Sequence, residues 1–290
     1  MDSSTSPQVS APVSAHVSAS AASSLDNIVP TQQLSYENVP ASEATKKFIE
    51  VSSQMGVTCA GILPKPDGTC NVHAFRTQVE FNAYAAKYKP RCFDYNDVLN
   101  SFDIKGKPSV ASKIADALSE IFGEVTILSY IGGKPDGTKD ASEYKIIVEL
   151  INNIIASERG VPCIISYVES TGKLPAVWDG SKAWILQSCL SHHPGMRAFL
   201  VDDKLKNVEP LKSIVNATGI VISRFTAKTP KCWKNRILEF FRVLKHVLPE
   251  RYKTQRAFED CLNGWLKPQP VAPPQEAQSS AHMGCPYCTF

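Results

Sequence analysis

Apolar residues in the central part of the chain follow two alternating periods. In 142–159 they recur every three or four positions, as on one face of a helix, and 109–122 shows the same spacing before Gly123. Short runs rich in β-branched residues predict strands between such segments. The predicted strands are 57–63, 70–75, 125–131, 161–168, 197–201 and 219–225, and the further predicted helices are 42–55, 77–88, 181–191, 204–216, 230–248 and 250–266. This alternation predicts an α/β or α+β fold with a mixed sheet packed by helices.

The predicted sheet begins with a hairpin, and the predicted core ends in two helices. The runs 57–63 and 70–75 flank the sequence PKPDGT, in which Gly68 can adopt the positive φ of a tight turn. The sequence KPDGT recurs at 134–138 in different surroundings, so we infer no internal duplication. Pro249 separates the last two helices, because proline cannot continue a helix.

Both ends of the chain have a composition that opposes a packed core. Of residues 1–24, 16 are Ser, Ala or Pro, and five prolines lie between Pro268 and Pro286. Such segments bury too little apolar surface to offset the entropy of ordering their backbone. We therefore expect disordered tails over 1–41 and 268–290, and a single α/β core over 42–267.

Hydropathy and cysteine content indicate a soluble protein of a reducing compartment. The N-terminal segment lacks the positive and apolar regions of a signal peptide, and no apolar run reaches the length of a membrane span. The nine cysteines are an odd number without a secretory context, so we expect reduced thiols that fill the core. The expected location is the cytoplasm.

Positive charge is concentrated near the end of the predicted core. Between residues 224 and 256, ten basic residues face only Glu239 and Glu250, a net charge of +8, whereas the whole chain carries +3. Such a surface can neutralise phosphates and release counterions. Helical spacing assigns aromatic residues such as Phe240 to a buried stripe and the cations to the solvated face. The predicted phosphate-binding residues are Arg224, Lys228, Lys231, Lys234, Arg236, Arg242, Lys245, Arg251, Lys253 and Arg256, and Lys105, Lys107 and Lys113 extend this surface if the fold brings them near.

The C-terminal sequence HMGCPYC holds three candidate zinc ligands, His282, Cys285 and Cys288. A closed structural zinc site needs four ligands, and a fourth is missing from this segment. The pair of cysteines also resembles a redox motif, but no helix can follow it to lower the pKa of the first thiol. Two exposed thiols are the remaining interpretation. We therefore expect neither a bound metal nor another cofactor.

The sequence contains none of the common catalytic signatures, since GxGxxG, the P-loop, HExxH and GxSxG do not occur. A nucleophile and its base could come from Cys189 with His192 or His193, because four-residue spacing can place Cys189 and His193 on one helical face. Asp202 and Asp203 end a predicted strand, where α/β enzymes place acids, but we favour a role in capping the following helix. We therefore expect a binding protein and not an enzyme.

The composition and layout of the chain are similar to those of a viral family. Ser, Ala and Pro make up 75 of the 290 residues and are concentrated at both ends, around a core with a basic region. In these respects the chain resembles the proline-alanine-serine-rich proteins of polymycoviruses, double-stranded RNA viruses of fungi. The resemblance implies a self-associating protein that coats viral RNA in place of a conventional capsid, in the cytoplasm of a fungal host.

Two function classes remain open besides an unrecognised Cys/His enzyme. The first is sequence-independent binding of RNA, in particular a double-stranded viral genome, by a homo-oligomer of the basic core. The second is a viral accessory factor, such as a silencing suppressor or a movement-type protein, that binds partner proteins through the proline-rich segment 268–290. The net charge of +3 is modest for a coat protein, so RNA binding requires the basic region to act locally or through many copies.

Overall fold

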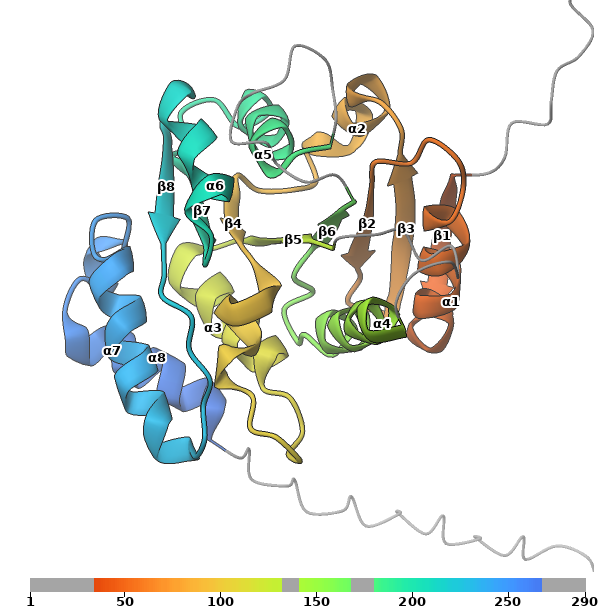
Figure 1. The fold of residues 1–290 in the computed structure, drawn as a ribbon. Helices are drawn as coiled ribbons and strands as arrows, with labels where there is room; N and C mark the ends of the chain where they lie inside the picture. Colours follow the sequence, from red (N-terminus) through yellow and green to blue (C-terminus); the bar gives the residue numbers. More distant parts are fainter. Residues whose placement is uncertain (1–33, 132–140, 168–179, 268–290) are drawn as a thin grey trace, which may run out of the picture. The chain divides into compact units, whose positions relative to one another are not determined.

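A computed structural model describes residues 34–131, 141–167 and 180–267. These residues form one mixed sheet of eight strands in the order β1-β3-β2-β6-β5-β4-β7-β8 (Figure 1). The strands are β1 (Ser35–Pro40), β2 (Cys59–Pro64), β3 (Thr69–Phe75), β4 (Arg91–Phe93), β5 (Thr126–Tyr130), β6 (Cys163–Ser166), β7 (Ala198–Asp202) and β8 (Ala217–Val221). The predicted α/β class and mixed sheet are confirmed.

The sheet has an antiparallel part and a parallel part. β2 and β3 form the predicted hairpin, β1 extends it at the edge, and β2 pairs antiparallel with β6. From β6 to β8 every neighbouring pair is parallel. Parallel neighbours need a crossover, and helices provide it between successive strands from β4 to β8.

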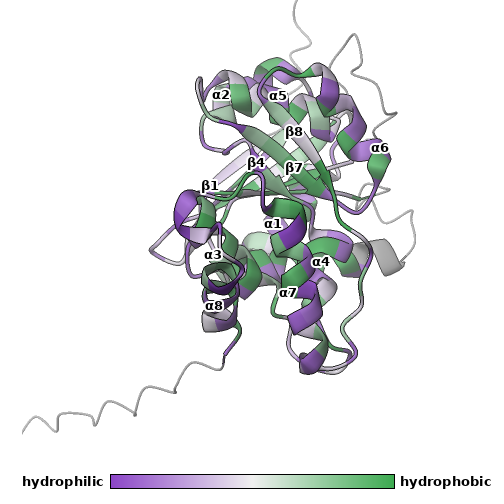
Figure 2. Ribbon diagram, turned by 90° about the vertical axis from the view of Figure 1, so that its left-hand side faces the viewer, coloured by the Kyte–Doolittle hydropathy of each residue, from purple (hydrophilic) through white to green (hydrophobic). Residues whose placement is uncertain are grey.

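Helices cover both faces of the sheet, as the predicted pattern requires. They are α1 (Ala41–Ser52), α2 (Gln78–Ala85), α3 (Ala111–Phe122), α4 (Ala141–Ile155), α5 (Lys182–Ser191), α6 (Leu205–Val208), α7 (Trp233–Leu244) and α8 (Gln255–Leu266). Figure 2 shows α2, α5 and α6 on one side of the sheet and the other five helices on the opposite side. Each layer closes its own apolar core against one face of the sheet. The seven cysteines within the described residues are free thiols, and five of them are buried.

Several element boundaries differ from the prediction. β1 lies inside the segment predicted as a tail, so the ordered core begins before residue 42. β4 was not predicted because its three residues are too few to show a period. The predicted helix 204–216 is instead the short α6 followed by a 3-10 helix, Glu209–Ser213, since Pro210 cannot donate the hydrogen bond that a continuing helix needs. The predicted helix 230–248 is shorter in the structure, where α7 begins at Trp233 and ends at Leu244.

The order of the parallel strands defines where a ligand can approach. From β4 the chain adds β5 and β6 on one side, and then returns to add β7 and β8 on the other side of β4. The connections from β4 and from β7 therefore leave the sheet in opposite directions. In doubly wound sheets the crevice at this reversal, outside the carboxyl ends of the strands, is the usual ligand site.

Within the described residues, no helix has both the length and the apolar character required to cross a lipid bilayer.

Candidate functional site

Three carboxylates meet at the carboxyl ends of β4 and β7. Phe93 pairs with Val201 in the parallel ladder, and the Asp94 N–H donates to the Val201 carbonyl at 2.9 Å. This register places Asp94, directly after β4, beside Asp202, the last residue of β7. Carboxylate oxygens of Asp94, Asp202 and Asp203 all lie within 4.8 Å of one another. The cluster thus occupies the point where the strand order reverses.

A buried lysine joins two of these carboxylates. The Lys182 Nζ lies 2.5 Å from Asp202 Oδ2 and 3.1 Å from Asp94 Oδ2, and its side chain is 2% exposed. Lys182 is the first residue of α5, where the Ser181 side chain accepts a hydrogen bond from the Trp184 N–H and caps the helix. A cation at a helix N-terminus opposes the helix dipole, and burial removes its hydration. A buried charge at an unfavourable end of a helix is the kind of local cost that proteins typically accept at functional sites.

The two carboxylates that hold Lys182 differ in their surroundings. Asp202 is completely buried, and it also accepts hydrogen bonds from the Lys204 N–H at 2.8 Å and from Asn207 Nδ2 at 3.0 Å. Asp94 accepts hydrogen bonds from the Tyr95 N–H at 2.8 Å and from the Ser129 hydroxyl, on β5, at 3.0 Å. The more heavily bonded Asp202 is suited to hold Lys182 and the following turn in place. It does not have the predicted capping role, because the N-cap residue of α6 is Lys204 and no side chain caps this helix.

The charges of the cluster follow from burial and from Lys182. Burial raises the pKa of the Asp94 carboxyl to about 6, although the Lys182 ammonium opposes this rise. Burial also acts to raise the pKa of Asp202, but Lys182 and the hydrogen bonds to the carboxylate hold it below its usual value. Burial acts to lower the pKa of Lys182, yet the two carboxylates keep it above its usual value. Of the two carboxylates that hold Lys182, Asp94 therefore has the less compensated charge.

The segment after β4 adds a fourth carboxylate at the mouth of the site. Asp97 has a φ of +57°, a conformation that residues other than glycine rarely adopt and that is often found at functional sites. Its carboxylate lies 3.5 Å from Arg224 Nε, which also pairs with Asp203 at 2.7 Å. The Arg224 side chain is 65% exposed, and its Nη groups make no hydrogen bond with any described residue. Arg224 thus covers the carboxylates and presents free donors at the mouth.

The donor set suits a divalent cation that prefers oxygen. Carboxylates are hard ligands, and Mg²⁺ typically binds one or two of them and completes its shell with water and phosphate oxygens. When ionised, Asp94, Asp97, Asp202 and Asp203 exceed the positive charge of Lys182 and Arg224 by two units. One divalent cation would neutralise this excess. Asp94 and Asp203 are the residues to hold it, because Asp202 is fully engaged by Lys182 and its other hydrogen bonds.

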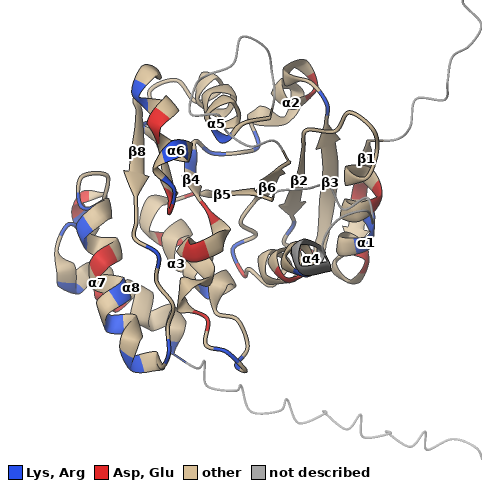
Figure 3. Cartoon of the chain, in the orientation of Figure 1, with Lys and Arg blue, Asp and Glu red and all other residues tan. Residues whose placement is uncertain are grey.

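Most of the predicted phosphate-binding cations lie on the surface of the C-terminal part. Figure 3 shows Lys and Arg along the segment between β8 and α7 and on α7 itself. Nine of the ten are exposed, and Arg236 is not part of this surface because its side chain is completely buried. Its guanidinium donates to the carbonyls of Asp97 and Ser223 and to the Ser101 hydroxyl. Arg236 is therefore buried in a position where it supplies the donors for these two backbone carbonyls.

The exposed cations divide into paired and unpaired groups. Lys253 pairs with Glu250, and Arg256 lies 3.7 Å from Asp260. Arg251 donates to the Glu120 carbonyl, and Arg224 belongs to the carboxylate site. Five cations form no ion pair with any residue in the described ranges, and these are Lys228, Lys231, Lys234, Arg242 and Lys245. These five form the unpaired basic strip.

The structure does not assemble the Cys/His site that the sequence left open. The Cys189 thiol is completely buried, and burial raises its pKa well above the usual value, which disfavours the reactive thiolate. His192 is exposed, and the His193 ring lies 3.2 Å from the Tyr88 carbonyl instead of the thiol. The candidate zinc ligands His282, Cys285 and Cys288 lie outside the described residues.

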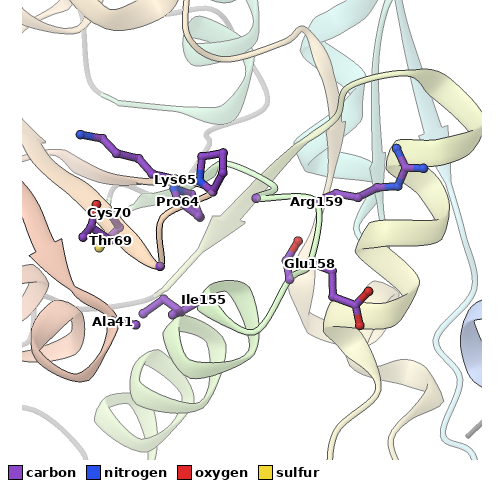
Figure 4. Close-up of a pocket in the computed structure, with 12 residues that line it drawn as sticks. Ala41, Pro64, Lys65, Thr69, Cys70, Ile155, Glu158 and Arg159 are labelled. Atoms are coloured by element: carbon purple, nitrogen blue, oxygen red, sulfur yellow. The ribbon is translucent and has the colours of Figure 1, made fainter. Parts of the chain in front are cut away.

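A separate pocket lies at the opposite edge of the parallel strands (Figure 4). It has a volume of about 340 Å³ and lies between the β2–β3 turn and the segment that connects α4 to β6. Figure 4 shows the side chains of Lys65 and Arg159 extending in opposite directions, so their charges do not converge on one ligand. The carboxylate cluster is therefore the better candidate for chemistry.

Sequence reasoning found one part of this site and missed the rest. Asp202 and Asp203 were noted at a strand end, but without a partner they indicated only a cap. Asp94 follows a strand too short to detect, and Lys182 is one of many lysines until the fold buries it. Comparison of the chain with protein-family models, with curated proteins and with solved structures gives no match.

Proposed function

We propose that this protein is a divalent-cation-dependent enzyme that hydrolyses or transfers phosphoryl groups, with Asp94 as the nucleophile. The observation that carries this proposal is the convergence of Asp94, Asp202 and Asp203 around the buried Lys182 ammonium, at the reversal point of a doubly wound sheet. The proposal departs from the sequence-based expectation of a binding protein without a cofactor.

Each residue has a distinct part in this reaction. Asp94 is the nucleophile, since its charge is less compensated than that of Asp202 and carboxylates form covalent phosphoryl intermediates. Asp94 and Asp203 would hold a divalent cation, and such a cation would neutralise charge on the transferred group. Lys182 supplies fixed positive charge in a buried site, where electrostatic stabilisation is strong. Asp202 holds Lys182 in position.

The proposed reaction has two steps, formation of an aspartyl phosphate and its hydrolysis. An Asp94 carboxylate oxygen attacks phosphorus, the bond from phosphorus to the leaving oxygen breaks, and the leaving oxygen takes a proton. Asp97, at the mouth, is the candidate donor of that proton. A water molecule then attacks the aspartyl phosphate and gives a proton to Asp97, which releases inorganic phosphate and returns the Asp94 carboxylate and the protonated Asp97. If another acceptor replaces water, the same intermediate transfers the phosphoryl group.

The test is release of phosphate from a set of small phosphate monoesters, including para-nitrophenyl phosphate, by the full chain. We expect hydrolysis that requires Mg²⁺ and stops on chelation. Asp94→Asn and Asp203→Asn should each abolish it, whereas Asp67→Asn, in the exposed β2–β3 turn, should not change it. Borohydride reduction during turnover, followed by mass spectrometry, should locate the acyl phosphate at position 94.

Two results would contradict the proposal. Hydrolysis that survives Asp94→Asn would assign the activity to another site or to a contaminant. A full chain that binds no divalent cation and releases no phosphate from any ester would exclude phosphoryl chemistry.

RNA binding is the second candidate function, and the unpaired basic strip favours it. Exposed cations without a neighbouring carboxylate are available to phosphates, and binding to them weakens steeply with salt. Coating of a double-stranded viral genome by a self-associating protein, which the polymycovirus resemblance implies, stays a prediction. A gel-shift titration with double-stranded RNA at two salt concentrations tests it, and binding that is indifferent to salt would contradict phosphate contacts.

A further inference from the structure

An apolar groove lies beside the unpaired basic strip. It has a volume of about 430 Å³ and is lined mainly by Phe102, Pro108, Val110, Pro230 and Trp233. The Trp233 Nε1–H donates to the Phe102 carbonyl at 2.8 Å, which fixes the indole while it stays partly exposed. Lys107 and Lys228 also line the groove, and both are exposed. The groove thus combines an aromatic surface with flanking cations.

One segment of chain connects this groove to the carboxylate site. The Ile222 N–H donates to the Asp202 carbonyl, Arg224 pairs with Asp203, and the chain continues to Lys228 at the groove. The four residues from Arg224 to Lys228 can span at most roughly 14 Å. Arg236 bonds to the carbonyls of Asp97 and Ser223, so it ties this segment to the loop that carries Asp97. The position of the groove relative to the carboxylate site is therefore fixed by this segment and by Arg236.

Charge along this route changes from acidic to basic. Carboxylates and Lys182 lie at one end, Arg224 at the mouth, and Lys228, Lys231 and Lys234 at the other end. Nucleobases stack on aromatic side chains, and their linking phosphates pair with cations, whatever the base sequence. At the stacked rise of about 3.4 Å, the route from mouth to groove corresponds to roughly four nucleotides.

We infer that the substrate is the phosphorylated end of a single-stranded nucleic acid. Its terminal phosphate enters the Asp94 site, its backbone follows the cations from Arg224 to Lys231, and a base several nucleotides inward stacks in the groove on Trp233. This inference rests on the proposed function, and it gives the unpaired basic strip a role in substrate choice. A mononucleotide is too short to reach both places.

Binding is measured with the full-length Asp94→Asn variant, so that turnover does not interfere. The probes are 12-nucleotide single strands of RNA and of DNA with a 5′-phosphate, a 3′-phosphate or neither, followed by fluorescence anisotropy. We expect binding to weaken about tenfold or more with Trp233→Ala and with Lys228→Glu/Lys231→Glu. Lys253→Glu/Arg256→Glu reverses as many charges among paired cations and should leave binding nearly unchanged.

Turnover is measured with the native chain on the same strands. The value of kcat/KM for a terminally phosphorylated strand should exceed that for a mononucleotide at least tenfold. Lys228→Glu/Lys231→Glu should remove this preference and leave hydrolysis of para-nitrophenyl phosphate unchanged. Because both lysines are exposed, this variant gives a valid result even if Trp233→Ala does not fold.

The possible failures are distinguishable. If small esters are hydrolysed but strands are no better than mononucleotides, the substrate inference is wrong and the proposed function stands. Duplex RNA that binds as tightly as single strands, with no effect of Trp233→Ala or of the lysine reversals, also overturns the inference. Strands that bind but lose no phosphate, with no small ester hydrolysed, refute the proposed function and the inference together.

Discussion

Among the residues that the structure describes, two cations are buried, Lys182 at the carboxyl edge of the sheet and Arg236 at the junction of α7 with the segment after β4. Lys182 pairs with the carboxylates of Asp94 and Asp202, and a carboxylate oxygen of Asp203 lies within 4.8 Å of both. Arg236 instead binds two backbone carbonyls, one hydroxyl and the Glu239 carboxylate. One cation is surrounded by an excess of negative charge, and the other mainly by neutral acceptors.

This difference separates a chemical site from a structural one. A buried cation that donates hydrogen bonds to backbone carbonyls holds the segments that carry them together. It leaves no excess negative charge that a ligand could neutralise. A buried cation in a group of carboxylates leaves negative charge that a divalent metal can balance, and that a nucleophile can use. Burial of a charge alone therefore does not identify function, whereas the charge balance around it does. The predictions below test this distinction, from the largest expected effect to the smallest.

Asp94→Asn should have the largest effect on activity and almost none on folding. We expect phosphate release to fall about 10³-fold or more, because the nucleophile is removed. Burial raises the pKa of Asp94 to about 6, so the carboxylate that predominates at pH 7 is less stable in the folded chain than in the unfolded chain. The amide should therefore leave stability unchanged or slightly increased in chemical denaturation. A variant that loses activity only by unfolding would contradict the assignment.

Lys182→Met should reduce both stability and activity. It leaves Asp94 and Asp202 buried without their cation, and breaking a buried ion pair typically costs about 3–5 kcal/mol. Urea denaturation at pH 7 measures the loss. Lys212→Met is the control, because Lys212 is exposed and its pair with Glu209 should contribute less than about 1 kcal/mol. Equal effects of the two substitutions would show that Lys182 is not held as described.

Arg236→Met should reduce stability by about 2–3 kcal/mol and activity only indirectly. The substitution leaves the Asp97 and Ser223 carbonyls and the Ser101 hydroxyl without their donor. Because Arg236 acts through the position of the Asp97 loop, kcat should fall less than with Asp94→Asn, and its pH profile should keep its shape. Arg242→Met, on the exposed face of the same helix, is the matched control and should change stability by less than about 0.5 kcal/mol.

Metal affinity should depend on pH through Asp94. A proton and a cation compete for this carboxylate, so affinity is full above its pKa of about 6 and falls as the pH drops below it. The expected slope is about tenfold per pH unit, because one proton is displaced. Titration calorimetry with Mn²⁺ from pH 7.5 to 5 measures this dependence. Asp94→Asn should remove the slope, and a slope that persists in this variant would assign the proton to another residue.

Local sequence patterns were sufficient for much of the fold. The period of 142–159, the Pro-Asp-Gly turn before Thr69 and the closing helices all appear in the structure, because helix and hairpin formation depend on neighbours along the chain. Patterns failed where an element was too short to show a period, as in β4, or where a tail residue pairs with a distant strand, as in β1.

The sequence by itself thus determined which segments become strands and helices, where one turn lies and where positive charge accumulates, since these depend on local periods and composition. Only the tertiary structure decided which charges are buried and which meet. Asp94 and Asp202 converge because β4 and β7 pair in parallel, and Lys182 joins them because α5 begins at the same edge. Such pairing depends on contacts between distant segments, which no local pattern encodes. The candidate site is therefore a product of strand order.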